Sequence, residues 1–396
     1  MTTELMRDFH MDATGLGNLT SFYYYSYVLM QLPVGVLVDS LGPRRLLIGG
    51  TLLAALGTFL FGLAPGFAAA AAARALVGGA TAVAWVVTLK IVAHWFTRPR
   101  YALFAGITLF AGNIGALVAQ VPLRLVLRSF DWRTVSFGAA ALVLAMSALA
   151  FFFVHDDPSS RGFQSFAAAA PAGPRAGLRQ LMGGIPGVFS YRNTWLIFLA
   201  QGGFVGAMLS FTGLWGPPFL RTRFALSQES AAAIVSLMTI CWATASPIAG
   251  WLSDRIGRRK PIYLGGALVA AAGWPILFYV DSLPLPAFVV LAGLTSFCCG
   301  AVIIGFAYAR ESVPPRFLGT ISAAINMGNM MAPMILQPAI GAVLDRNWHG
   351  ALAGTVKVFG MDAFHAGFAL IVTWSVLSCA LISLTRETSC RQHVQL

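Results

Sequence analysis

Apolar runs of about 20 residues recur along the whole chain, and this is the length that a helix needs to cross a bilayer. Only 10% of the residues are charged and 58% are hydrophobic, whereas soluble domains carry about 25% charged residues. Because lipid offers no hydrogen bonds to the backbone, the sequence predicts an all-α membrane protein. Eleven helices are expected, at residues 16–38, 45–64, 67–96, 101–125, 132–154, 191–219, 228–252, 261–280, 285–310, 316–344 and 362–385.

A short polar turn occurs twice between these runs, with Asp254 of the second copy 215 positions after Asp39 of the first. Internal repeats of this kind are typical of secondary transporters. We therefore expect an N-terminal bundle over 1–154, a cytoplasmic central loop over 155–190 and a C-terminal bundle over 191–396. The end of the loop is either a short amphipathic segment at the membrane surface or a linker. The two copies read Gly35-Val-Leu-Val-Asp39-Ser-Leu-Gly42-Pro-Arg44-Arg45 and Gly250-Trp-Leu-Ser-Asp254-Arg255-Ile-Gly257-Arg258-Arg259-Lys260.

Alignment of the halves on this turn places residues 1–15 opposite the loop that follows the helix at 191–219. No apolar run precedes residues 1–15 in this sequence, so the first helix of a twelve-helix plan is expected to be missing. Either the start codon has been assigned too late, or the protein has eleven helices. We favour the late start, because an odd count breaks the pairing of two six-helix halves.

The net charge of +12 raises the question of nucleic-acid binding. The basic residues lie in short turns between apolar runs, however, which is the positive-inside pattern and not a nucleic-acid surface. Placing the turn at 39–45 in the cytoplasm gives the cytoplasmic loops about twice the Arg and Lys of the opposite side. This predicts a cytoplasmic C-terminus in a multi-pass plasma membrane protein. The arginine-rich, alanine-rich composition favours the inner membrane of a bacterium.

The repeated Gly-x-x-x-Asp-x-x-Gly-x-Arg-Arg/Lys turn resembles the signature of the major facilitator superfamily, in the loops between helices 2–3 and 8–9. The first copy departs from it at Ser40. The segment from Arg74 to Gly79 is similar to the Arg-containing motif of the fourth helix, whereas the Gly-Pro antiporter motif of the fifth helix is absent. Three further segments resemble a branch of organic-solute permeases: Asp131-Trp-Arg133, Gly213-Leu-Trp-Gly-Pro-Pro218 and Glu311-Ser-Val-Pro-Pro315.

The resemblance implies two pseudo-symmetric helical bundles and a gating role for the repeated turn. A carboxylate at Asp39 or Asp254 can form a charge-assisted latch with Arg44 or Arg259. In the family such latches hold the outward-facing state and break when the halves rock. The alternative is a static topology anchor. The gating candidates are Gly35, Asp39, Gly42, Arg44, Arg45, Gly250, Asp254, Arg255, Gly257, Arg258 and Arg259.

Two cations, Arg74 and Lys90, lie inside apolar runs, and no acidic residue lies deep in one. An intramembrane cation usually faces a partner or a water-filled cavity, although each of these could also snorkel to the headgroups. Cations without matching acids favour anionic substrates. A proton-coupled symporter commonly needs a buried carboxylate or histidine, which the missing helix could supply.

Polar and aromatic side chains within the apolar runs complete the substrate candidates. Tyr23, Tyr27 and Gln31 share one helical face. Buried amides more often join helices than bind ligands, so each candidate has that alternative. The remaining candidates are Trp85, Asn113, Gln201, Tyr308, Asn326 and Asn329.

We therefore expect a carrier, secondary active or facilitative, that moves a small polar or anionic organic solute by alternating access. No catalytic constellation, metal site or cofactor motif is present in the sequence, so an enzyme is not expected. The expected partners are the solute, lipid and a coupling ion (H+ or Na+), with no nucleic acid, and the protein is expected to be a monomer. Two alternatives stay open. A multidrug or metabolite exporter would show dye efflux, and a non-transporting receptor or scaffold would bind without flux.

The mass of the protein made from its native locus tests the expected missing helix. We expect it to exceed 42.1 kDa by roughly a helix of 25–30 residues. A mass of 42.1 kDa would instead mean a true eleven-helix chain.

Overall fold

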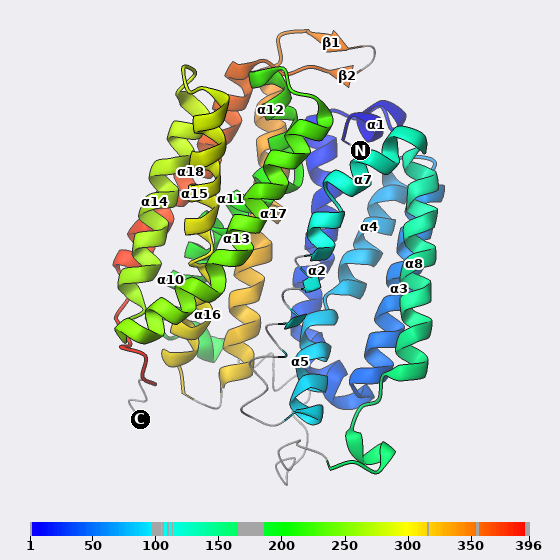
Figure 1. Ribbon diagram of the computed structural model, residues 1–396, viewed down its shortest axis with the longest axis vertical. Helices are drawn as coiled ribbons and strands as arrows, with labels where there is room; N and C mark the ends of the chain where they lie inside the picture. Colours follow the sequence, from blue (N-terminus) through cyan, green and yellow to red (C-terminus); the bar gives the residue numbers. More distant parts are fainter. Residues whose placement is uncertain are drawn as a thin grey trace. The chain divides into compact units, whose positions relative to one another are not determined.

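The computed structural model describes residues 2–96, 104, 107–108, 111–112, 114–164, 186–314, 317–353 and 356–392 (Figure 1). Helices dominate this part, and one small antiparallel pair joins β1 (Leu352–Ala353) to β2 (Val356–Lys357). The α-helices are α1 (Thr2–Asp8), α2 (Ala13–Leu41), α3 (Pro43–Leu63), α4 (Phe67–Thr81), α5 (Ala84–Trp95), α7 (Val121–Ser129), α8 (Trp132–Phe153), α10 (Arg192–Ala200), α11 (Val205–Ser210), α12 (Gly216–Phe224), α13 (Gln228–Ile256), α14 (Lys260–Tyr279), α15 (Leu285–Cys299), α16 (Val302–Glu311), α17 (Leu318–Arg346) and α18 (Met361–Ser383). Shorter turns are η1 (Pro158–Arg161), η2 (Gln201–Gly203) and the π-helical η3 (Phe211–Trp215).

Nine helical segments of the described chain are long and apolar enough to cross a membrane, which confirms the predicted all-α membrane fold. They coincide with nine of the eleven predicted runs. The predicted run at 16–38 lies in α2, which is not among the nine. The run at 101–125 falls largely outside the described residues, so the total of eleven stays a prediction. The nine are Pro43–Leu63, Phe67–Val92, Trp132–Phe153, Arg192–Phe224, Gln228–Ile256, Lys260–Tyr279, Leu285–Glu311, Gly319–Arg346 and Met361–Ser383.

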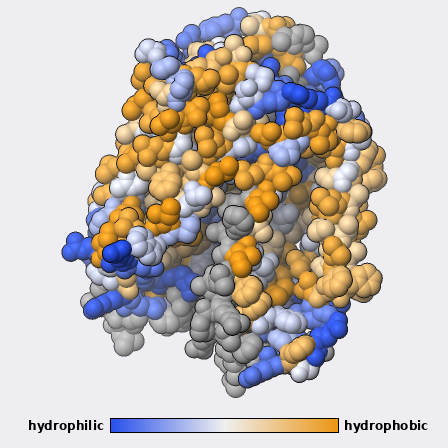
Figure 2. All heavy atoms as spheres, in the orientation of Figure 1, coloured by the Kyte–Doolittle hydropathy of each residue, from blue (hydrophilic) through white to orange (hydrophobic). Residues whose placement is uncertain are grey.

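The exposed surface of these helices is apolar. Only 17% of the most apolar stretch of α8 is buried, and Leu142, Phe152 and Phe153 are among its exposed side chains. On the face drawn in Figure 2, hydrophobic residues cover the middle of the helices and hydrophilic residues gather at their ends. An exposed apolar band between polar ends is what a bilayer requires of its proteins.

The chain forms two compact units, each assembled from more than one segment of the sequence. The smaller unit comprises Phe22–Gly115 and Ser129–Gly183. The larger unit comprises Met1–Ser21, Ala116–Arg128 and Gly184–Leu396. Helix α2 therefore begins in the larger unit and ends in the smaller one.

In the smaller unit, α3 packs against α4 and α8 (Figure 1). Small residues on α3 allow the close approach, because a Cβ at Gly57 would lie 2.8 Å from Val77 and one at Gly62 would lie 2.7 Å from Phe137. Arg133 at the start of α8 donates to the carbonyls of Gly62 and Ala64, at 2.9 and 2.8 Å. It thereby satisfies the carbonyls at the C-terminal end of α3, which lack partners in the helix itself.

In the larger unit, a cluster of buried aromatic rings forms the core at the end of α14. Phe211 and Phe219 pack against rings of α14 and α18. Arg223 of α12 lies over the Phe288 ring and donates to the carbonyls of Leu277 and Val280. An arginine from another helix therefore satisfies the C-terminal end of α14, as Arg133 does for α3.

Helices α2 and α4 cross most closely at Gly78. A Cβ there would lie 2.0 Å from the Tyr23 carbonyl oxygen and 2.5 Å from Ser26 Oγ. The neighbouring Gly79 has room, since its nearest contact would be Met30 Cγ at 3.5 Å. The Gly78-Gly79 pair of the fourth-helix motif thus has one position that sets the crossing and one that does not.

Replacement of the two glycines by alanine should separate these roles. We expect Gly78→Ala to destabilise the protein by about 2 kcal/mol or more, because the backbone of α2 must move. Gly79→Ala, the matched control, should be neutral or stabilise by up to about 1 kcal/mol through helix propensity. Thermal unfolding in detergent measures both. Equal effects at the two positions would contradict the assigned crossing.

Candidate gating and substrate sites

The second copy of the repeated turn closes α13. Gly257 adopts the left-handed conformation (φ 71°), and its N–H donates to the carbonyls of Ser253 and Asp254. This reversal folds Arg259 back over the helix end, so that its Nη1 lies 2.5 Å from Asp254 Oδ1. The sequence predicted this pair, and the structure brings the two residues together.

Arg259 also reaches a second carboxylate, on Glu311 at the end of α16. Its Nη2 and Nε lie 2.7 and 3.0 Å from Glu311 Oε1. Both side chains are largely buried, at 10% and 15% exposure, whereas Asp254 is 67% exposed. Burial alone would lower the pKa of Arg259, but its hydrogen bonds to Glu311 and Asp254 raise that pKa. We call Asp254, Arg259 and Glu311 the Arg259 latch.

A third carboxylate caps the helix that follows the turn. Glu387, beyond the end of α18, accepts from the backbone N–H groups of Arg259 and Lys260 at 3.0 and 2.9 Å. Burial would raise the pKa of Glu387, but the backbone donors outweigh burial and lower it. Thr388 donates to Glu311 Oε2 at 2.6 Å, so the segment after α18 closes the latch from the other side.

The first copy of the turn has different partners. Gly42 is again left-handed (φ 82°), but Arg44 donates from its backbone N–H to Asp156 and from Nη2 to the Phe151 carbonyl, both at 2.6 Å. Asp156 follows α8 and caps α3 as Glu387 caps α14. Lys90 Nζ lies 3.3 Å from the Val38 carbonyl, which joins α5 to the end of α2.

The remaining gating candidates have simpler surroundings. Arg255 lies over the Trp251 ring at 5.2 Å, and Arg45 and Arg258 are exposed. Gly250 meets nothing within 4 Å where its Cβ would be. Gly35 belongs to α2, and the side chain of Asp39 lies outside the described part of the chain.

Three substrate candidates meet in the smaller unit. Arg74 of α4 lies over the Tyr23 ring, with Cζ 5.5 Å from the ring centroid, and Tyr23 stacks on Tyr27 at 5.9 Å. The Tyr23 and Thr81 hydroxyls are 3.0 Å apart. The described residues offer Arg74 no carboxylate. Gln31, one helical turn beyond Tyr27, is buried.

In the larger unit, the span Arg192–Phe224 is interrupted at η2 and again at η3. Gln201 in η2 is fully buried and accepts from the Tyr263 hydroxyl at 3.3 Å, while its Nε2 meets no acceptor among the described residues. Gly202 and Gly203 follow it because a Cβ on either would collide with Trp374 or Ser378. Irregular turns inside membrane spans often mark functional sites.

The other candidates are dispersed. Tyr308 is fully buried, and its hydroxyl lies 2.8 Å from both Thr385 Oγ1 and the Arg386 carbonyl oxygen. This hydroxyl therefore joins α16 to the segment after α18. Trp85 is 38% exposed on α5, and Asn113 lies outside the described residues. On α17, Asn326 is half-buried and Asn329 is buried.

A family model described as Major Facilitator Superfamily matches residues 1–240 and 198–393, which together include nearly the whole chain. The chain belongs to the major facilitator superfamily. The glycerol-3-phosphate transporter of Bacillus subtilis is 22% identical over 96% of this chain and 86% of its own length. A probable galactarate/D-glucarate transporter of Pseudomonas putida is 26% identical over 87% of this chain and 81% of its own length.

Solved structures of this superfamily have the same fold. A bacterial homologue of the human lysosomal transporter Spinster, solved in an inward-facing, unoccupied conformation, aligns with a TM-score of 0.73 at 17% identity. That alignment covers 98% of this chain and 91% of the other. Since its relatives and structural neighbours in the superfamily are transporters, the protein is a solute transporter and not an enzyme.

The sequence did not predict the three carboxylates that contact the repeated turns. In the sequence, Glu311 belongs to a segment that resembles permeases but has no predicted role, and Asp156 and Glu387 have no predicted role either. The sequence does show that all three carboxylates lie at or just after the end of an apolar run, where a helix end needs partners. Which basic residue each one meets depends on helix packing.

A double-mutant cycle tests the Arg259 latch. We expect Arg259→Gln and Glu311→Gln each to cost about 2–4 kcal/mol, because each leaves a largely buried charge without its partner. The double variant should cost less than the sum of the two by at least about 1 kcal/mol. Asp254→Asn should cost under about 1 kcal/mol, because that carboxylate is exposed.

The exposed neighbour provides the control for this cycle, with unfolding in detergent as the measurement. Arg258→Gln should change stability by no more than about 0.5 kcal/mol. Additive effects of the Arg259 and Glu311 substitutions would show that the two side chains do not interact.

Proposed function

We propose that this transporter carries a small organic anion, and that Arg74 binds the anionic group. The observation that carries the proposal is the Arg74 guanidinium within a membrane span, which lies over the Tyr23 ring. The described residues give this guanidinium no carboxylate. A cation at such a depth is costly unless a partner or a water-filled cavity compensates it. A transported anion supplies that partner during part of the cycle.

The superfamily relatives support an anionic substrate. The two reported above are named as transporters of glycerol 3-phosphate and of galactarate/D-glucarate, all of which are anions at neutral pH. Tyr23 adds an aromatic ring and a hydroxyl group beside Arg74, and Tyr27 stacks on Tyr23. Such groups suit a hydroxylated anion, because phenols bond to hydroxyls and phosphates alike.

The proposed cycle is alternating access, with the repeated turn stiffening one end of each helical bundle. The Arg259 latch binds α13 and α16 to each other, and Glu387 adds the start of α14 and the segment after α18. Bundles that rock against each other must move as rigid bodies, so a break at this point would uncouple the motion. In this proposal the end that carries Arg255, Arg258, Arg259 and Lys260 faces the cytoplasm of a bacterium, as does the C-terminus, and the protein is a monomer in the inner membrane.

Uptake into proteoliposomes tests the substrate class. We expect the wild-type protein to move radiolabelled glycerol 3-phosphate or D-glucarate and to discriminate against neutral glycerol. Arg74→Gln should lower uptake at least about thirty-fold, the equivalent of roughly 2 kcal/mol. Arg74→Lys should retain part of the activity, because it keeps the charge but loses the planar fork.

Arg161→Gln is the matched control, because Arg161 is an exposed arginine of the same unit. Its uptake should equal that of the wild type. Equal transport of glycerol, or full activity of Arg74→Gln, would refute the anion assignment. Binding of an anion without flux would support the receptor alternative, and efflux of dyes would support the exporter. Ionophores added to the same assay distinguish H+ from Na+ coupling.

A further inference from the structure

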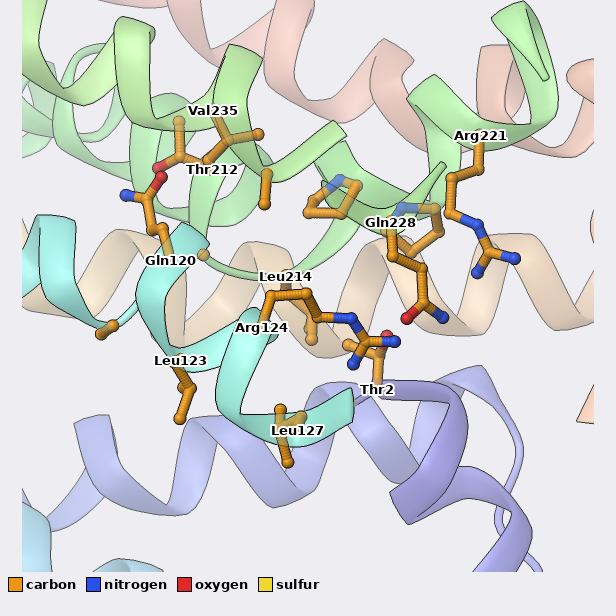
Figure 3. Close-up of a pocket in the computed structure, with 15 residues that line it drawn as sticks. Thr2, Gln120, Leu123, Arg124, Leu127, Thr212, Leu214, Arg221, Gln228 and Val235 are labelled. Atoms are coloured by element: carbon orange, nitrogen blue, oxygen red, sulfur yellow. The ribbon is translucent and has the colours of Figure 1, made fainter. Parts of the chain in front are cut away.

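A cavity of about 200 Å³ lies in the larger unit, at the end where α13 begins. Its walls come from the start of α1, from α7 and the residues just before it, from η3 and α12, and from the first turns of α13 (Figure 3). The Arg259 latch lies at the opposite end of α13, so the cavity and the latch are separated by the length of that helix. The volume suits a small organic ion and not a drug-sized ligand.

The charged side chains that line the cavity are all basic. Arg124 and Arg221 both line it, and none of its described lining residues is acidic. Arg221 is exposed, and the described residues offer it no carboxylate. In Figure 3 the polar ends of Arg124 and Gln228 point toward each other, and Arg221 extends from α12 toward the same space. Two guanidinium groups that converge in this way attract an anion.

Arg124 already holds a carboxylate of the chain itself. Its Nη1 donates to Glu4 Oε1 of α1 at 2.9 Å, and the Arg124 side chain is 15% exposed. Glu4 is not among the residues that line the cavity. It therefore binds Arg124 from beside the cavity, and a carboxylate or phosphate entering the cavity would compete with it for the same guanidinium.

Of the two glutamines that line the cavity, one is bonded to another helix and one can bond to a ligand. The side-chain amide of Gln120 is already hydrogen-bonded within the protein, to Ser236 and Thr239 of α13 at 2.9 Å each. Gln228, at the start of α13, has no partner among the described residues and so can bond to a ligand. The rest of the wall is largely apolar and includes Leu123, Leu127, Leu214, Pro217, Pro218, Ala232 and Val235.

The Gly213–Pro218 segment, noted in the sequence for its resemblance to permeases, shapes this wall. Trp215 Nε1 donates to the Gln337 carbonyl at 3.0 Å, which fixes the π-helical turn. Gly216 cannot carry a side chain, because a Cβ would lie 2.6 Å from the Phe211 carbonyl oxygen. Pro217 and Pro218 then start α12 and direct Arg221 one turn later toward the cavity.

We propose that this cavity is a second anion site, in which Arg221 and Arg124 bind the carboxylate or phosphate of a small organic anion and Glu4 competes for Arg124. The ligand class rests on the proposed function, whereas the residues of the site are separate from Arg74. In the orientation proposed above, this end faces the cell exterior.

Opposite effects of two substitutions on the KM for uptake test the site, with glycerol 3-phosphate and D-glucarate as the probes. Arg221→Gln should raise KM about tenfold with little change in the maximal rate, because the cation binds the anion before the transport step. Arg221→Lys should restore most of the affinity. Glu4→Gln should lower KM about threefold, because it removes the competing carboxylate. A purely structural role would make both Arg221→Gln and Glu4→Gln impair transport.

The control separates binding from general electrostatic attraction. Arg346→Gln removes an exposed positive charge at the same end of the larger unit, outside the cavity lining, and should leave KM unchanged. An equal rise in KM for Arg346→Gln and Arg221→Gln would overturn the site in favour of long-range steering.

A direct binding measurement keeps the site testable without transport. Each probe should slow the reaction of a neutral thiol reagent with Gln228→Cys at least about fivefold, and Arg221→Gln should abolish this protection. Protection without uptake would refute the proposed function but support the site. Uptake by the wild type without protection, and with KM unchanged in Arg221→Gln, would refute the site alone.

Discussion

Much of this structure depends on how the backbone groups at the ends of α3 and α14 find hydrogen-bond partners. In a bilayer, the unpaired backbone groups of a helix end must find partners within the protein. Asp156, which follows α8, and Arg133, in the first turn of α8, satisfy the two ends of α3. Glu387 and Arg223 do the same for α14. The two pseudo-equivalent helices are thus held at both ends by charged side chains from other elements, although the elements that supply the arginine differ.

This arrangement explains why two nearly identical turns have different surroundings. Each turn uses a left-handed glycine to reverse the chain before the next helix, at Gly42 and Gly257. In the first copy, Arg44 turns to the end of α8 and takes a backbone carbonyl as its partner. In the second copy, Arg259 bridges Asp254 and Glu311 and becomes the more buried and more strongly bound residue. The two copies therefore share the same backbone conformation at the glycine, whereas the partner of the arginine depends on the helix that packs beside each turn.

The distribution of acidic and basic side chains is consistent with the anionic substrate proposed above. Carboxylates cap helices at Asp156 and Glu387, pair with Arg259 at Glu311, and bind Lys357 and the start of α2 at Asp345. These acidic groups are engaged at helix ends and so are not available to neutralise a cation inside a span. Arg74 in one unit and Arg221 in the other are left with aromatic, amide and apolar neighbours. This distribution of charge is the structural basis of the anionic substrate proposed above.

The sequence by itself determined the membrane class, the helical fold and the duplicated turn, because each depends on local composition and spacing. Apolar runs of bilayer length can form only helices, and a Gly-rich turn between them reverses the chain wherever it occurs. The pairing of Asp254 with Arg259 was also predictable, since the two residues lie five positions apart across that turn. Only the tertiary structure decided that Arg259 meets Glu311, that Asp156 and Glu387 cap α3 and α14, that Tyr308 joins α16 to the segment after α18, and that Arg124 and Arg221 line one cavity. These contacts join residues that are from about 50 to more than 100 positions apart, so helix packing and not sequence spacing brings them together.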